Sequence, residues 1–199
     1  MTATAFYFDL ASPLAYLAAE RVLHVLPFAA EWQPVLASGL LASAADADGD
    51  RGVRDGGPTR EEIERRAAEL GLQPLRWPEP FPFDSALAMR VASYAKSIGR
   101  VVPFAQAAFR QAFAGGHSLA ERDVVLIAAA ACEMHPAAVI RGAELRSVAE
   151  QLAAATAAAA ALGVGEVPAV AVDGRIFSGE RSLQAAAEHM RELSVGERA

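Results

Sequence analysis

Two short motifs at opposite ends of the chain carry residue types that could do chemistry. Near the N-terminus, Ser12 and Pro13 follow the apolar run TAFYFDLA. Serine is a strong helix N-cap and proline fits the first helical position, so this motif predicts a helix that begins at Pro13. The free N–H groups at such a helix start favour a bound anion, including a thiolate, and Ser12 adds a hydroxyl donor. The alternative is that Ser12 only caps its helix.

The second motif is Val167-Pro168, which opens the run VPAVAV. A proline at the start of a strand indicates a specialised X-Pro bond and makes this bond a candidate for the cis form. If the two ends of the chain pair in one sheet, the backbone of Val167 faces the first helix and can bind an extended, peptide-like ligand. The alternative is an ordinary loop proline.

The elements that must position these motifs follow from hydrophobic spacing and turn residues. Strands are expected over residues 4–10 and 30–36, with a helix between them that stops at Pro27, and Pro34 indicates that the second strand lies at an edge. After a helix-rich block, the turn Asp173-Gly174 predicts a hairpin, which a last helix follows. The hairpin strands are expected over 167–172 and 175–178, and the last helix over 181–193.

Within the block, capping boxes and glycines mark the expected helices, and residues 40–58 are expected to form a loop because they are small, polar and glycine-rich. The expected helices are Thr59 to Gly71, Asp84 to Gly99, 102–114, one opened by the capping box Ser118–Glu121 and containing Cys132, and 144 to Leu162. This order predicts an α/β protein: a thioredoxin-like fold with a large all-helical insertion. Residues 1–39 and 163–199 would form the thioredoxin-like domain, and residues 40–162 the insertion with its connecting helix.

Composition excludes several classes of function. The chain has 199 residues, 53% of them hydrophobic, and a net charge of −6, which argues against nucleic acid or an anionic membrane as the partner. A single cysteine excludes an internal disulfide framework and a cysteine-rich metal site, and the histidines show no metal-ligand spacing, so no metal is expected. The N-terminal residues lack the pattern of a signal peptide, so we expect a cytoplasmic location.

Longer motifs extend the pattern to a known family. The segments FYFDLASPLAYLA and GVGEVPAVAVDGRIFSGERSL resemble the opening and closing motifs of 2-hydroxychromene-2-carboxylate isomerases and kappa-class glutathione transferases. Both are branches of the DsbA-like thioredoxin superfamily. The resemblance covers nearly the whole chain in order and continues through Trp32-x-Pro34, Ile63 to Gly71 and Pro82 to Arg90.

The resemblance implies a thiol-dependent enzyme with Ser12 as its catalytic residue. The C-x-x-C of a redox thioredoxin is here Ser12-Pro13-Leu14-Ala15, which cannot form a disulfide. In the family the thiol arrives with bound glutathione, and the serine hydroxyl donates a hydrogen bond to its sulfur. Isomerisation then follows when the thiolate adds to a conjugated carbon, the adjacent double bond rotates and the thiolate leaves.

The resemblance also implies which residues bind the thiol. These are Pro13, Val167, Pro168 and the segment Glu180-Arg181-Ser182. Arg181 occupies the position where the family has an aspartate for the amino end of glutathione, and the family's loop asparagine and lysine have no clear counterparts. The departures leave three ligands open: glutathione, another low-molecular-weight thiol, or an organic acid bound without any thiol.

Two other functions remain open at this point, a kappa-like glutathione transferase or peroxidase and a catalytically silent thioredoxin-like binding module. The expected partner is a small aromatic or conjugated substrate, and the resemblance implies a homodimer. Aromatic side chains of the insertion are candidates for an acceptor pocket, with ordinary packing as the alternative. They are Phe81, Phe83, Phe104 and Phe109.

Overall fold

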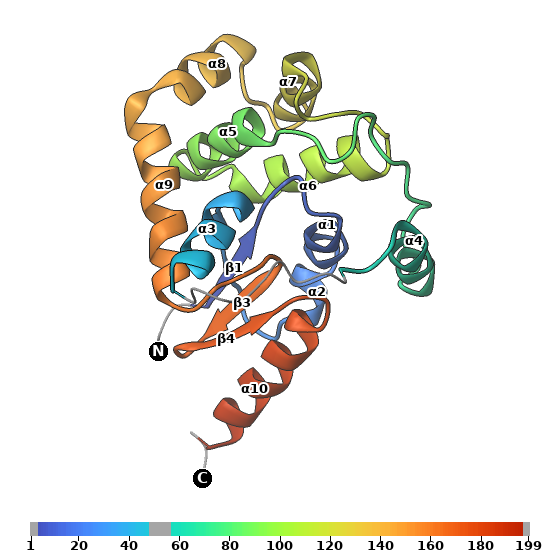
Figure 1. Cartoon of the computed structure of the whole chain (residues 1–199), viewed down its shortest axis with the longest axis vertical. Coiled ribbons are helices and arrows are strands. Elements are labelled where there is room, and N and C mark those ends of the chain that lie inside the picture. Colours follow the sequence, from blue (N-terminus) through green and yellow to red (C-terminus); the bar gives the residue numbers. More distant parts are fainter. Residues whose placement is uncertain (1–3, 48–56, 197–199) are drawn as a thin grey trace.

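A four-stranded mixed sheet lies at the centre of the molecule. The computed structural model describes residues 4–47 and 57–196 (Figure 1). The strand order is β2-β1-β3-β4, in which β1 is parallel to β2 and antiparallel to β3, and β3 and β4 form a hairpin. The strands are β1 (Ala5–Phe8), β2 (Glu31–Pro34), β3 (Ala169–Val172) and β4 (Arg175–Ser178). The sheet confirms the expected edge position of Pro34 and the predicted hairpin.

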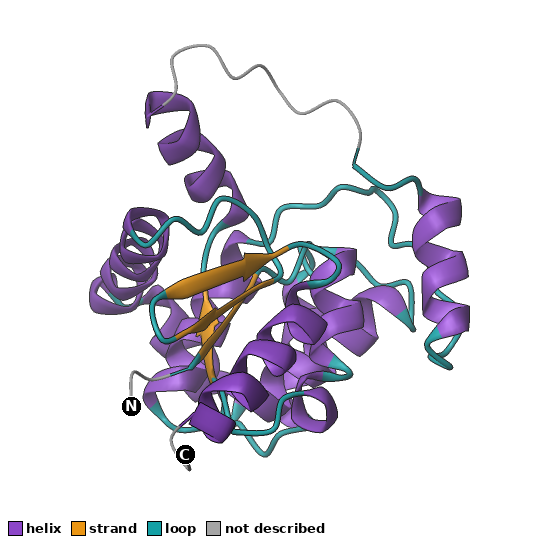
Figure 2. Cartoon of the chain, turned by 90° about the horizontal axis from the view of Figure 1, so that it is seen from below, coloured by secondary structure: helices purple, strands orange, loops and turns teal. Residues whose placement is uncertain are grey.

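Helices cover both faces of this sheet (Figures 1 and 2). They are α1 (Pro13–Ala19), α2 (Val22–Val25), α3 (Ala37–Ala47), α4 (Arg60–Glu69), α5 (Ala86–Ser97), α6 (Val101–Phe113), α7 (Arg122–Ala130), α8 (Pro136–Glu144), α9 (Arg146–Ala161) and α10 (Ser182–Gly196). Helices α5 to α8 gather at the top of Figure 1 as the helical insertion. Among the described residues, no helix combines the length and the apolar character needed to cross a bilayer.

Alternation along the strands explains why both faces are covered. Successive side chains of a strand point to opposite faces. Phe6, Phe8 and Val170 join the larger core with residues of α1, α5, α6 and α10, whereas Tyr7 and Ala169 join a smaller core with residues of α3 and α9. A strand buried on both faces reads as a continuous apolar run, as residues 5–8 do.

Three expectations for the helical block are wrong. Residues 37–47, partly assigned to a loop, form α3, while the expected loop's residues 48–56 lie outside the described residues. The capping box at Ser118 does not form, because the helix begins only at Arg122 and ends at Ala130, before Cys132. His135-Pro136 starts α8 instead of only breaking a helix: the His135 Nδ1 atom accepts a hydrogen bond from the Ala137 N–H at 3.3 Å.

The segment before Pro27 and the start of α3 also depend on packing. The single helix expected after Pro13 divides into α1 and α2 at Glu20 and Arg21. Helix α3 approaches α9 closely at Gly39, where a Cβ atom would lie 2.8 Å from the Thr156 Cγ2 atom. This contact between helices distant in sequence is invisible to a local pattern.

Most of the aromatic residues proposed for an acceptor pocket pack into the larger core. Phe104 and Phe109 are fully buried, and Phe83 is 8% exposed. Only Phe81 is half-buried, with its ring edge-on to Trp77 at a centroid distance of 5.0 Å. Phe104 and Phe109 are therefore core residues, which corrects the expectation that they line a pocket.

Candidate functional site

Ser12 lies at the junction between β1 and α1, as the sequence predicts. Its extended backbone places the side chain over the first turn of α1, where Oγ accepts a hydrogen bond from the Ala15 N–H at 3.1 Å. Pro13 occupies the first helical position, where its missing N–H removes no helix hydrogen bond. The N-cap expected for Ser12 is therefore present.

A buried carboxylate shapes this junction. Asp9 is 3% exposed, and its two carboxylate oxygens accept hydrogen bonds from the N–H groups of Ala11 and Ala37, each at 2.9 Å. Its carbonyl accepts a third from the Ser12 N–H at 3.0 Å. Asp9 thus ties the turn before α1 to the start of α3.

The antiparallel pairing of β1 and β3 brings the two motifs together. Because Tyr7 pairs with Ala169, the end of β1 adjoins the beginning of β3. The Ser12 hydroxyl donates to the Val167 carbonyl oxygen at 3.4 Å, across 155 positions of sequence. The Val167–Pro168 peptide bond is cis.

The backbone of the segment after β4 contacts the same junction, at Pro168. The Gly179 N–H donates to the Pro168 carbonyl at 2.8 Å, and Gly179 adopts a φ of +79°, which favours glycine. Ser182, which begins α10, is 1% exposed, and its Oγ has no hydrogen-bond partner among the described residues. Arg181 is exposed.

Glu180 turns instead towards α4. Its Oε1 atom lies 2.7 Å from the Nε atom of Arg66. The approach is off the N–H axis, so the contact is an ion pair, and the buried Nε–H of Arg66 has no hydrogen-bond acceptor among residues 4–47 and 57–196. Arg66 also donates from Nη1 to the exposed Glu69 at 3.0 Å.

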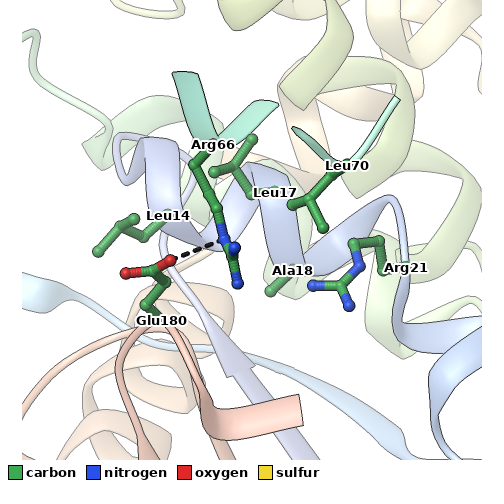
Figure 3. Close-up of a pocket in the computed structure, with 7 residues that line it drawn as sticks. All are labelled: Leu14, Leu17, Ala18, Arg21, Arg66, Leu70 and Glu180. Carbon is green, nitrogen blue, oxygen red and sulfur yellow. Dashed lines mark ion pairs between the residues drawn. The ribbon is translucent and has the colours of Figure 1, made fainter. Parts of the chain in front are cut away.

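A small pocket surrounds this ion pair beside α1 (Figure 3). Its water-accessible volume is about 10 Å³, room for roughly one water molecule, so the walls must move apart to admit an organic ligand. Ser12 and Val167 lie outside its lining. The lining residues are Leu14, Leu17, Ala18, Arg21, Arg66, Leu70 and Glu180.

Of the described residues that line this pocket, Arg21 and Arg66 carry guanidinium groups and Glu180 carries a carboxylate. Burial, and next the nearby charge of Arg66, lower the pKa of Arg21. With the Gln184 amide oxygen turned to face it, Arg21 donates to that neutral oxygen from both terminal nitrogens, at 2.5 and 3.1 Å. No carboxylate within the described ranges lies at ion-pair distance from Arg21.

The chain's own thiol lies elsewhere. Cys132 follows α7 in the helical insertion and is 8% exposed. Burial raises the pKa of its thiol, which disfavours the reactive thiolate. A thiolate at Ser12 would therefore have to come from a bound molecule.

Sequence reasoning missed Asp9, Arg21 and Arg66 as parts of this region. Asp9 stood in the junction DLASP without an assigned role, although a carboxylate just after a buried strand could have suggested one. The arginines carry no local signal, because they meet only when α1, α4 and the segment before α10 pack together.

Comparison with known structures identifies the fold's relatives. A 2-hydroxychromene-2-carboxylate isomerase superimposes with a TM-score of 0.81 at 16% identity, covering 99% of this chain and 98% of that one. A probable DsbA oxidoreductase from Streptomyces coelicolor gives 0.75 at 19% identity, covering 98% and 91%. The cytosolic disulfide reductase DsbM from Pseudomonas aeruginosa, solved with GSH, gives 0.65 at 15% identity, covering 99% and 100%.

At these identities the structures establish the fold, and the family comes from the sequence. No curated protein sequence matches the chain significantly. The family of DSBA-like thioredoxin domains matches residues 4–191, nearly the full length. With its mixed sheet, its helical insertion and the junction of Ser12 with Val167, this chain belongs to the DSBA-like thioredoxin domain family.

Proposed function

We propose that this protein is a thiol-dependent isomerase that acts on an aromatic or conjugated small molecule, as 2-hydroxychromene-2-carboxylate isomerase does. The observation that carries the proposal is the Ser12 hydroxyl, which caps α1 and lies 3.4 Å from the Val167 carbonyl oxygen. Ala15 stands one helical turn on, so this position offers no second thiol or thiolate. The site suits a guest sulfur anion and cannot perform disulfide exchange.

The proposed reaction is an addition followed by its reversal. The thiolate sulfur of the bound thiol forms a bond to a conjugated carbon, and the π pair moves onto the substrate's carbonyl oxygen. The former double bond rotates as a single bond, the pair returns, and the carbon–sulfur bond breaks to restore the thiolate. No electrons are gained or lost overall, so the reaction needs no oxidant or reductant.

The chain's own residues supply binding and electrostatics in this scheme. The Ser12 hydroxyl turns from Val167 to donate to the sulfur, and the N-terminal end of α1 stabilises the negative charge. Val167 and Pro168 present backbone to an extended thiol, and Pro13 lies beneath it. The hydroxyl donor and the helix end favour thiolate over thiol at neutral pH, which raises the concentration of the nucleophile.

The segment after β4 would hold the other end of the thiol. Glu180 carries the negative charge for an ammonium group, because Arg181 replaces the family's aspartate. Ser182 Oγ, which has no partner in the part of the chain that the structure describes, offers a further polar contact. We propose glutathione as the first thiol to test. The likeness in fold to a disulfide reductase solved with GSH supports this choice.

A spectrophotometric assay tests the function. Purified protein should change the ultraviolet spectrum of 2-hydroxychromene-2-carboxylate only when glutathione or another small thiol is present. Loss of one hydrogen bond to the reacting anion, in Ser12→Ala, should slow turnover about 100-fold. Ser118→Ala is the matched control, since Ser118 Oγ also accepts a backbone N–H but lies in the insertion.

Other outcomes select the alternatives. Turnover of a model electrophile without turnover of the chromene acid would select a kappa-like glutathione transferase or peroxidase. The narrowness of the pocket beside α1 favours the third possibility, a silent binding module. Absence of turnover with every thiol tested, despite a folded protein, would select that module.

A homodimer in the cytoplasm is part of the same proposal. Sedimentation equilibrium should give twice the mass of one chain, and cell fractionation should recover the protein with cytoplasmic markers. A monomer of the mass of a single chain would contradict the first of these expectations.

A further inference from the structure

We propose that Arg21 and Arg66 form a carboxylate-binding subsite beside α1, which takes a carboxylate group of the thiol or of an aromatic acid substrate. The inference deepens the proposed function, on which its choice of ligand rests. Figure 3 shows both guanidinium groups in the same pocket, between α1, α4 and Glu180.

The charges of the pocket point to an anion. Among the described residues that line it, two carry guanidinium groups and only Glu180 carries a carboxylate. Arg21 is held only by the neutral amide oxygen of Gln184, so its charge has no counter-ion among the described residues. A bound carboxylate would supply the missing counter-charge and relieve the repulsion between the two cations.

The Nε–H donor of Arg66 also indicates an anionic ligand. Buried N–H groups are nearly always hydrogen-bonded, because leaving one unpaired is unfavourable. The Nε–H of Arg66 is buried, and Glu180 approaches it from the side, without accepting its hydrogen. A carboxylate oxygen placed in line would satisfy this donor, and guanidinium is the cation best suited to carboxylate geometry.

The apolar wall defines the rest of the ligand. Leu14, Leu17 and Leu70 line the pocket beside the charged groups. Such a mixture suits an acid with an apolar or aromatic body, or the methylene stem of a peptide, better than a free inorganic ion.

The distance from Ser12 suits a ligand that spans both places. Arg21 lies seven positions after Leu14, just beyond the end of α1 at Ala19, and seven positions correspond to about 10 Å at the rise of a helix. An extended tripeptide also spans about 10 Å. A thiol bound at Ser12 could therefore place a carboxylate between Arg21 and Arg66.

Titration calorimetry with thiol-free acids tests the subsite apart from catalysis. The probes are S-methylglutathione and 2-hydroxybenzoate, with the diethyl ester of S-methylglutathione as the uncharged comparison. The variants are Arg21→Gln and Arg66→Gln, and the control is Arg65→Gln, an exposed arginine of α4 that pairs with Glu69 outside the pocket. Thermal melting verifies that each variant folds. If Arg66→Gln perturbs the fold, Arg21→Gln alone decides the result.

We expect at least one acid to bind, and each pocket variant to weaken its binding about tenfold, while Arg65→Gln leaves it unchanged. The ester should bind wild-type protein as weakly as the acid binds the variants. Whichever acid responds identifies the source of the carboxylate. Equal binding of acid and ester, unchanged affinity in both pocket variants, or no binding of either acid would each overturn the subsite.

The result is separable from the proposed function. Arginine-dependent binding of an acid, without turnover in the presence of any thiol, would keep the subsite and remove the isomerase. Turnover that depends on Ser12 but is indifferent to both arginines would keep the isomerase and remove the subsite.

Discussion

The two sides of helix α1 differ in how completely their groups are paired. On the side of α6, the Tyr16 ring stacks on Phe113 at a centroid distance of 5.6 Å. Beyond it, Glu20 accepts two hydrogen bonds from Arg110, both at 2.8 Å. On the side of α4, Leu14 is half-buried, and the pocket holds two arginines with one carboxylate.

The arginines on the two sides show what the difference means. The hydrogen bonds that Arg110 donates to Glu20 raise the pKa of Arg110, so the fold stabilises that cation. Burial and the charge of Arg66 lower the pKa of Arg21, so the fold leaves that cation unfavourably placed. The ion pair of Arg110 stabilises the free protein. Arg21 has no such pair within the described residues, so an anionic ligand can still form one with it.

The largest effect should come from the packed side. Phe109 is fully buried between β1 and α1, so Phe109→Ala should destabilise the protein by about 3–5 kcal/mol through lost burial and a cavity. Leu14→Ala, on the open side, should cost only about 1 kcal/mol. Urea unfolding measures both. Equal losses would show that the two sides of α1 are packed alike.

A smaller effect should separate the two arginines. Arg110→Gln removes the double hydrogen bond to Glu20 and should lower the free energy of unfolding by about 0.5–1 kcal/mol, because the Arg110 side chain is mostly exposed to solvent although Glu20 is not. Arg21→Gln removes a cation that repels Arg66 and should leave stability unchanged or slightly higher. A larger loss for Arg21→Gln than for Arg110→Gln would reverse the comparison.

The smallest effect concerns pH. Burial, followed by the charge of Glu20, raises the pKa of the Tyr16 hydroxyl. The unfolded phenol therefore loses its proton first, so the contribution to stability is complete below about pH 10 and is lost as pH rises beyond it. Unfolding between pH 9 and 11.5 should show a shallower decline for Tyr16→Phe. An unchanged slope would mean that Tyr16 titrates alike in both states.

Local sequence was enough for the elements whose ends are capped by nearby residues. Thr59 and Glu62 form the predicted capping box of α4, and each accepts a hydrogen bond from the other's backbone N–H. Asp173 and Gly174 make the predicted hairpin with positive φ at both positions. These features depend on neighbours a few positions away, and a local pattern contains those neighbours.

Local sequence failed where packing or a single side chain decided. Helix α3 begins where Asp9 accepts the N–H of Ala37, a contact that joins two separate segments. The motif His135-Pro136 can end one helix or begin another, and the pattern of apolar residues does not distinguish these two roles. In the structure it begins α8.

By itself the sequence determined that Ser12 caps a helix, that position 15 holds no cysteine, and that Val167-Pro168 opens a strand, because propensity and covalent chemistry are local. Only the tertiary structure decided that the Ser12 hydroxyl meets the Val167 carbonyl, and that Arg21, Arg66 and Glu180 share one pocket. Their meeting depends on the order of strands in the sheet and on the angle at which α4 packs against α1. Both are set by the burial of apolar surface across the whole chain.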